Sequence, residues 1–312
     1  MTDLPVDKQA WQQATLEKLL FASLKEQRTK RRWSIFFKLL FWSYLLAILW
    51  LFWPNKTVPA ITKDSGHTAL IDIKGEIADE ETSNADNLVA ALRHAFADKH
   101  SKGLILRINS PGGSAVQAFY IYDEIMRLRT LHPHIPIYAV CSDVCASAAY
   151  LMASATDKIY ANPASFVGSI GVLMEGFGFV DIQKKLGIER RLITAGEHKG
   201  FFDPFSPLAA SDVQYAKTML DDVHQQFITY VIKGRGKRLK VTPDTFSGLV
   251  WTGHQALPLG LIDGYGSAAY VAREIIKQET IVDYSVKPNP LEQFVNHFGM
   301  SFYSRIANYL NH

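Results

Sequence analysis

The sequence contains little cysteine. Its two cysteines, Cys141 and Cys145, are too few for a disulfide framework, and they lack the partners of a zinc site. Because free cysteine usually packs as a small hydrophobic residue, both are predicted to be buried, and a local disulfide between them is the alternative. Hydrophobic residues make up 48% of the 312 positions and charged residues 20%, which excludes a disordered or collagen-like chain. The chain is long enough to bury a substantial core.

The body of the chain also lacks an excess of positive charge. The whole sequence has 33 Lys and Arg against 30 Asp and Glu, a net charge of +3. Residues 1–32 hold seven of these basic residues and four of the acidic ones, so the other 280 residues are neutral overall. A nucleic-acid-binding surface needs a basic patch on the folded body, so no nucleic-acid partner is expected.

A long hydrophobic run follows this basic tail. From Trp33 to Trp53 there are 21 residues with one charge, Lys38, and about 20 apolar residues span a bilayer as a helix. Lys38 lies near one end, where it can reach the headgroups, and tryptophan suits the membrane interface. The sequence therefore predicts a cytoplasmic tail over 1–32, a single transmembrane anchor over 33–53 and an extracytoplasmic body.

Two alternatives to the anchor are weaker. A buried core helix rarely has so long an apolar run. A cleaved signal peptide is disfavoured because 32 residues of polar character precede the run and no small-residue cleavage site follows closely. In a bacterium, the prediction places the protein in the inner membrane with its body on the periplasmic or external side.

After a polar linker over 54–66, strand-like and helix-like segments alternate. Alternation of this kind predicts one α/β domain with parallel strand pairing, over 67–280. Residues 281–312 are predicted to form an amphipathic helical extension that packs within an assembly. Strands are predicted at 67–75, 103–108, 136–141, 158–161 and 191–194, and helices at 84–99, 116–131, 146–153, 209–234, 256–262 and 267–277.

Three short segments hold residues suited to hydrolysis. In NSPGG at 109–113, adjacent glycines can turn the backbone and expose amides to an anion, although most such segments are plain turns. Ser147 stands among small residues where a strand meets a helix, which suits a nucleophile or an ordinary N-cap. Lys199 has glycine and three phenylalanines nearby, and an apolar setting would favour the neutral amine that acts as a general base. A solvated surface lysine is the ordinary interpretation.

The order of the motifs is more specific than any one of them. The series runs NSPGG, ASAAYLMAS, TDKIYANP, SFVGSIGV, GEHKGFFDPFSP and VWTGHQALPLGLID. It resembles the signal peptide peptidase A family of membrane-anchored Ser/Lys peptidases over about residues 67–275. The resemblance implies an α/β fold of the Clp protease/crotonase type, with parallel sheets and flanking helices, preceded by one N-terminal transmembrane helix. It also implies that 67–280 is the peptidase domain.

The resemblance implies a role for individual residues. Ser147 matches the nucleophile and Lys199 the general base, while Ser169 matches the hydroxyl that holds the lysine amine. The oxyanion donors implied are the amides of Gly113 and Ala148, with Gly112 shaping the turn. Family members often carry Gly-Gly after the serine, whereas this chain has Ala148 and Ala149, which alters the shape of the cleft more than the chemistry.

The implied function is a serine endopeptidase that cleaves short hydrophobic peptides, chiefly remnant signal peptides, outside the inner membrane. No cofactor and no metal are expected. In short members of the family the subunits form a homo-oligomeric ring, and the dyad is shared between subunits.

Three alternatives stay open. A Ser–His pair could use His198, but adjacent residues on an extended segment point to opposite sides. The others are a crotonase-like acyl-CoA enzyme and a catalytically inactive membrane scaffold.

Overall fold

The computed structural model describes residues 6–51 and 66–286, and the chain divides into two units between residues 62 and 63. The first unit contains one helix, α1 (Val6–Leu51). Among these described residues, no helix combines the length and the apolar character needed to cross a membrane. The last two residues of the predicted anchor, Phe52 and Trp53, lie outside the described residues, as does nearly all of the predicted linker.

A sheet of eight strands forms the centre of the second unit. Its order is β6-β5-β3-β2-β1-β8, with β4 beside β3 and β7 beside β4. Every pair is parallel except β5 with β6. The strands are β1 (His67–Lys74), β2 (Ser101–Ser110), β3 (Ile137–Ala146), β4 (Lys158–Ala161), β5 (Phe166–Gly168), β6 (Val250–Thr252), β7 (Gly264–Tyr265) and β8 (Ile281–Asp283).

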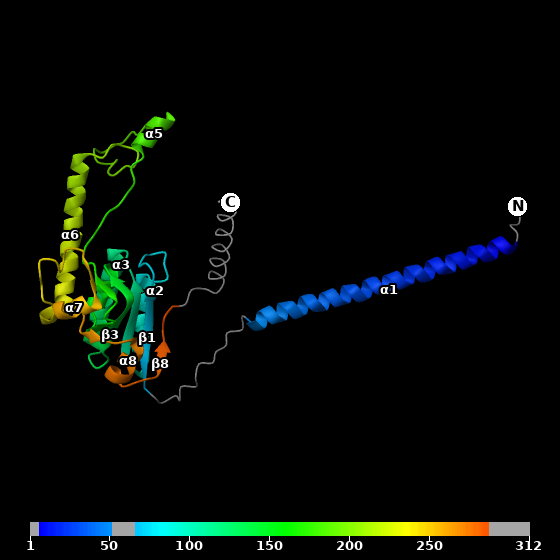
Figure 1. The fold of residues 1–312 in the computed structure, drawn as a ribbon, viewed down its shortest axis with the longest axis horizontal. Helices are drawn as coiled ribbons and strands as arrows, with labels where there is room; N and C mark the ends of the chain where they lie inside the picture. The colour runs from blue at the N-terminus through cyan, green and yellow to red at the C-terminus, as the bar shows by residue number, and fades with distance from the viewer. Residues whose placement is uncertain (1–5, 52–65, 287–312) are drawn as a thin grey trace. The chain divides into compact units, whose positions relative to one another are not determined.

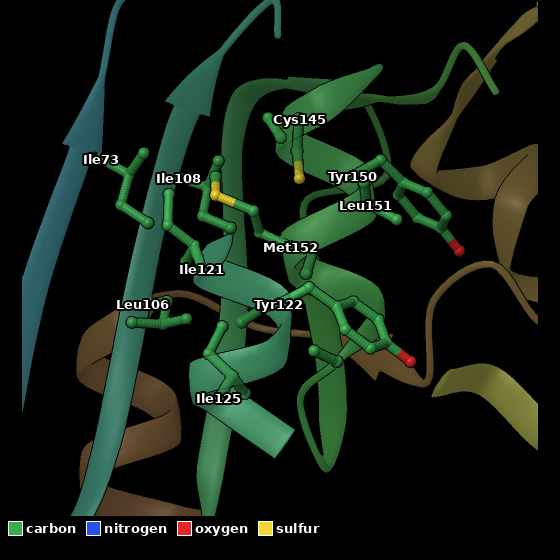
Figure 2. Packing of buried hydrophobic residues seen from close by; sticks show 14 of the residues in the cluster. Ile73, Leu106, Ile108, Ile121, Tyr122, Ile125, Cys145, Tyr150, Leu151 and Met152 are labelled. Atoms are coloured by element: carbon green, nitrogen blue, oxygen red, sulfur yellow. The ribbon is translucent and has the colours of Figure 1, made fainter. Parts of the chain in front are cut away.

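Helices cover both faces of this sheet. On one face lies the main core, which contains α2 (Ala85–Ala97), α3 (Ala115–Leu131) and α4 (Ala148–Ser154). Figure 2 shows Ile73, Leu106 and Ile108 of the strands beside side chains of α3 and α4. On the other face, α8 (Ala268–Tyr270) and the π-helix Val271–Ile276 cover a smaller cluster. Burial on both faces explains the nearly continuous apolar strands and confirms the predicted α/β class.

The boundaries of the helices follow local capping. Asn84 and Ser114 each accept a hydrogen bond from the backbone amide three residues on, at the starts of α2 and α3. The helix α7 (Gly253–Leu259) begins with a capping box between Thr252 and Gln255. Both cysteines are free and buried, as predicted.

Two parts of the sequence-based prediction differ from the structure. Residues 191–194 form no strand, because among the described residues they have no strand to pair with, and Ile193 is 94% exposed. At the other end, β8 pairs with β1, so the sheet continues beyond residue 280. The predicted C-terminal extension lies outside the described residues from residue 287 on.

The segment between β5 and the end of α6 (Ala210–Arg235) projects from the sheet, with α5 (Val180–Leu186) at its far end (Figure 1). We call residues 171–209 the arm. No residue of α5 is buried, and most buried residues of α6 lie in its second half. Apolar side chains exposed on the arm include Leu173, Phe177, Ile182, Leu186, Ile188, Ile193 and Leu208. A single chain therefore leaves a wide apolar surface uncovered.

A buried histidine joins the first strand of the second unit to the segment after its last strand. The His67 side chain is 3% exposed, and its Nε2–H donates to the Tyr284 hydroxyl at 3.0 Å. That hydroxyl donates to Asp98 Oδ2 at 2.6 Å. The Nδ1 atom of His67 is buried with no hydrogen-bond partner among the described residues. Burial lowers the pKa of His67 from its usual 6.5, because a proton on Nδ1 would have no acceptor.

This network predicts a loss of stability in mild acid. A histidine whose pKa is lowered by folding stabilises the folded state above the unfolded pKa of 6.5, and this contribution disappears as the pH falls below it. The free energy of unfolding, measured by denaturant titration, is therefore expected to decrease between pH 7.5 and pH 5. His67→Phe should reduce this pH dependence, whereas His134→Gln at an exposed site should leave it intact. An equal pH dependence in His67→Phe would contradict the assignment.

Candidate active site

An irregularity in the pairing of β2 with β3 brings two predicted motifs together. Ile108 pairs with Cys141, but Ser110, two residues further on, pairs with Cys145, four residues further on. The extra residues form a bulge in β3, and bulges redirect a strand where it ends. The side chain of Asn109 fixes the bulge by accepting a hydrogen bond from the Val144 amide at 3.1 Å. As a result, the turn after β2 lies against the start of α4.

Ser147 lies at this junction, on a sharp turn between β3 and α4. Its φ of 54° and ψ of −127° are unusual for a residue with a side chain and cost about 1–3 kcal/mol. The backbone on both sides is held in place: the Ser147 amide donates to the Gly168 carbonyl at 2.8 Å, and the Ser147 carbonyl accepts from the Leu151 amide at 3.0 Å. These bonds keep the serine in a strained conformation, which is common at catalytic positions.

Two glycines allow the turn after β2 to reach Ser147. Gly112 and Gly113 have φ values of 113° and 142°, which residues with a side chain rarely adopt. A Cβ on Gly112 would lie 2.7 Å from the Cβ of Ser147 and 3.0 Å from the Ala148 amide nitrogen. A Cβ on Gly113 would overlap the carbonyl of Ile77, which accepts a hydrogen bond from the Ser114 amide. Only glycine permits this close approach.

A cleft of about 810 Å³ is lined by four of the six predicted site residues. Gly113, Ser147, Ala148 and Ser169 all line it, and Gly112 lies directly behind Ser147. The Ala148 amide belongs to the first turn of a helix, where amides lack an acceptor within the helix. Apolar side chains from several elements line the rest of the cleft: Ala115, Phe119, Leu151, Val172, Leu173, Val223 and Phe227.

Ser169 also has a constrained backbone. Its φ is 51°, and its amide donates to the Leu249 carbonyl at 2.8 Å. The next residue, Ile170, has its carbonyl oxygen 3.1 Å from Nε2 of His224, on α6. The wall of the cleft that carries Ser169 is therefore attached both to the segment before β6 and to α6.

Lys199 is separate from this cleft. It does not line the cleft, and its side chain is exposed on the arm. Within the described residues, neither Lys199 Nζ nor Ser147 Oγ nor Ser169 Oγ makes a hydrogen bond. The single chain therefore brings together the predicted nucleophile, the oxyanion donors and Ser169, but does not place the predicted base beside them.

The sequence did not identify several residues of the cleft. Phe119 and Phe227 lie on α3 and α6, and His224 lies one turn before Phe227. In a sequence, an apolar residue beside a cleft has the same helical spacing as one in the core, so no local signal distinguishes them. Within residues 6–51 and 66–286, no three His, Cys, Asp or Glu side chains are grouped so that they could hold a metal ion.

Two protein families match the chain. The model of peptidase family S49 matches residues 129–281, and the model of Clp protease matches residues 59–167. Together they cover the sheet, the cleft and the arm. The chain belongs to the S49 family of serine peptidases, which is the signal peptide peptidase A family, and has a Clp-like fold. This confirms the resemblance found in the sequence.

Among the individual proteins that match, one is named as an antiporter and two are named as peptidases. The chain is 46% identical over 175 residues to the Na⁺/H⁺ antiporter NhaA of Brucella abortus, covering 56% of this chain and 24% of that protein. It is 27% identical over 224 residues to a protein of Enterococcus faecium provisionally named signal peptide peptidase SppA. The match covers 69% of this chain and 64% of that protein. It is 31% identical over 229 residues to Protease 4 of Haemophilus influenzae, and the match covers 70% of this chain and 37% of that protein. The chain thus spans less than two thirds of each of these relatives.

The close approach of the glycine turn gives a direct prediction. Gly112→Ala is expected to reduce the rate of peptide hydrolysis strongly, because its Cβ would displace Ser147 or the Ala148 amide. The matched control is Gly236→Ala, since Gly236 has a φ of 56° but nothing within 4 Å of an added Cβ. That variant should lose about 1 kcal/mol of stability, measured by thermal unfolding, and keep its activity per folded molecule. Equal activity losses in both variants would contradict a specific role for Gly112.

Proposed function

We propose that this protein is a membrane-anchored serine endopeptidase that hydrolyses short hydrophobic peptides with a dyad of Ser147 and Lys199. The observation that carries the proposal is the cleft, where a serine on a strained turn lies together with Gly113 and Ala148. Membership of a serine peptidase family supports the same reaction.

The roles of the residues follow from acyl transfer. The neutral amine of Lys199 takes the proton from Ser147 as Oγ attacks the carbonyl carbon of the peptide bond. The amides of Gly113 and Ala148 donate to the oxyanion of the tetrahedral intermediate. The protonated amine then gives its proton to the departing amine, leaving an acyl-serine. A water molecule, deprotonated by Lys199, attacks the acyl-serine and releases the second product.

The substrate class follows from the walls of the cleft. Its side chains are mostly apolar, with Phe119, Leu151 and Phe227 at partly enclosed positions. Such a surface suits extended peptides with apolar side chains. Signal peptides contain an apolar stretch of about 7–15 residues, and the name of the Enterococcus faecium relative agrees. Remnant signal peptides are therefore the proposed substrates.

A second copy of the chain is proposed to supply the base. Lys199 lies on the arm, outside its own cleft, and the arm carries an uncovered apolar surface. In a homo-oligomeric ring, the arm of one subunit can place Lys199 at the Ser147 of its neighbour. Burial between subunits would exclude water from the surroundings of the amine. Ser169, on the wall of the cleft, is proposed to hold the amine.

The anchor is proposed from the sequence. The run from Trp33 to Trp53 has the length of a transmembrane helix, and the basic cluster before it favours a cytoplasmic N-terminus. This orientation puts the catalytic domain on the extracytoplasmic side of the bacterial inner membrane, where cleaved signal peptides are accessible from the lipid.

The dyad predicts a pattern of inactivation. A fluorophosphonate probe should label the wild-type protein and not Ser147→Ala, because the probe reacts with an activated serine. Lys199→Arg should lose nearly all labelling and peptide hydrolysis, because a guanidinium stays protonated in proteins and cannot act as a base. His198→Gln serves as the control and should stay active. Full activity in Lys199→Arg would remove this lysine from the mechanism.

The shared dyad predicts complementation between inactive subunits. Ser147→Ala and Lys199→Ala chains are each expected to be inactive alone. Co-expressed chains should regain part of the activity, because some boundaries in a mixed ring pair an intact Ser147 with an intact Lys199. Differently tagged chains allow co-assembly to be verified by pull-down. A verified mixed assembly without activity would contradict the sharing of the dyad.

The proposed topology can be measured independently. A reporter enzyme that is active only outside the cytoplasm, fused after residue 66, should be active. Reversing the charges of Arg28, Lys30, Arg31 and Arg32 should disturb this orientation. A fusion with the native charges that stays inactive, although it is expressed, would argue against an extracytoplasmic domain.

A further inference from the structure

Lys199 lies within a segment whose two ends are joined by an ion pair. Arg190 NH1 bonds to Asp203 Oδ1, thirteen residues along the chain. The Asp203 side chain is 7% exposed and that of Arg190 35%, so this pair is much better shielded from water than most surface pairs. It closes residues 190–203 into a loop. Within this loop, Lys199 is exposed.

The carboxylate of Asp203 has further partners. Its Oδ2 accepts from the Ser206 hydroxyl at 2.6 Å, and Oδ1 faces the Phe205 amide at 3.4 Å. The hydrogen bond from Arg190 is the main reason why the pKa of Asp203 is lowered, so the carboxylate stays ionised into acidic conditions. The ion pair therefore persists into acidic conditions.

Aromatic rings attach the same pair to the rest of the arm. The guanidinium of Arg190 lies over the ring of Phe205, 5.2 Å from its centre. The ring of Phe205 packs on Phe179, with centroids 5.5 Å apart, and the Phe179 amide donates to the Pro204 carbonyl at 2.7 Å. Phe179 directly precedes α5. The base of the loop is thus fixed to a helix of the arm.

The interior of the loop has only local turns. The amide of Lys199 donates to the Gly196 carbonyl at 3.1 Å, and the amide of Phe201 donates to the His198 carbonyl at 3.0 Å. The described residues of the loop belong to no strand or helix. A segment of this kind has many accessible conformations, and joining its ends removes a large part of them.

A neighbouring ion pair offers a comparison. Arg191 NH2 lies 3.2 Å from Glu189 Oε2, but the two side chains are 81% and 74% exposed. Such a pair contributes little to structure. The arginines of these two ion pairs are adjacent in the chain, but only the Arg190–Asp203 pair is shielded and bonded to its surroundings.

We propose that Arg190 and Asp203 are positioning residues, which hold the loop so that Lys199 reaches the Ser147 of a neighbouring subunit. The inference rests on the proposed function. Because the pair closes the loop that carries Lys199, its effect on activity is expected in the subunit that donates the lysine and not in the subunit that donates the serine. A pair that served only folding or assembly would act equally in both subunits.

The test places Asp203→Asn in one subunit at a time. The starting mixture contains Ser147→Ala chains, which donate Lys199, and Lys199→Ala chains, which donate Ser147. Asp203→Asn on the Ser147→Ala chain is expected to lower the peptidase activity of the mixture by about 10²-fold, the usual effect of a misplaced catalytic group. The same substitution on the Lys199→Ala chain should leave the activity unchanged. Arg191→Gln, the matched control, should have no effect on either chain.

Equal losses in the two placements, or no loss in either, would overturn the proposal. If Asp203→Asn chains do not assemble, Arg190→Gln replaces them, and Arg190→Lys should retain more activity because it keeps the charge. If the starting mixture is inactive although co-assembled, the shared dyad fails, and the pair is then tested in otherwise wild-type chains. There, a lower kcat with an unchanged KM for Asp203→Asn supports the positioning role, and an unchanged kcat overturns it.

Discussion

The site depends on the contact between the turn after β2 and the start of α4. Gly112 approaches Ser147 so closely that no side chain fits between them, and the bulge in β3 is what brings the two backbones to this distance. The strained Ser147 lies in one cleft with Gly113 and Ala148 as a consequence of this contact. Because the turn follows one strand and the serine follows its neighbour, the parallel sheet is the scaffold that positions the proposed catalytic groups.

The two residues of the proposed dyad lie on different parts of the chain. Ser147 lies at the edge of the main core, where strands and helices are buried together. Lys199 instead lies on an arm held by an ion pair, packed aromatic rings and local turns, with much apolar surface exposed. Under the proposed function, assembly covers this surface and completes the dyad at once. A single subunit then lacks activity, which suits a peptidase that must not cleave its surroundings before assembly.

The sequence predicted the strands and the turn around Ser147 better than the architecture of the arm. NSPGG and Ser147 stand at strand ends in a chain with clear strand–helix alternation, so their meeting at one edge of the sheet follows from parallel pairing. The strand predicted at 191–194 was wrong, because β-branched residues favour a strand only where a partner strand is available. Phe119, His224 and Phe227 were not identified as part of the cleft, since their spacing equals that of core positions.

By itself, the sequence determined the α/β class, the buried free cysteines and the family, because these depend on local patterns and motif order. Only the tertiary structure decided that Ser147 takes a strained conformation, that apolar side chains of α3 and α6 line its cleft, and that Lys199 lies outside it. The ion pair between Arg190 and Asp203 was likewise decided only by the tertiary structure. All of these features join residues far apart in the chain, and no local pattern records which of them fold against one another.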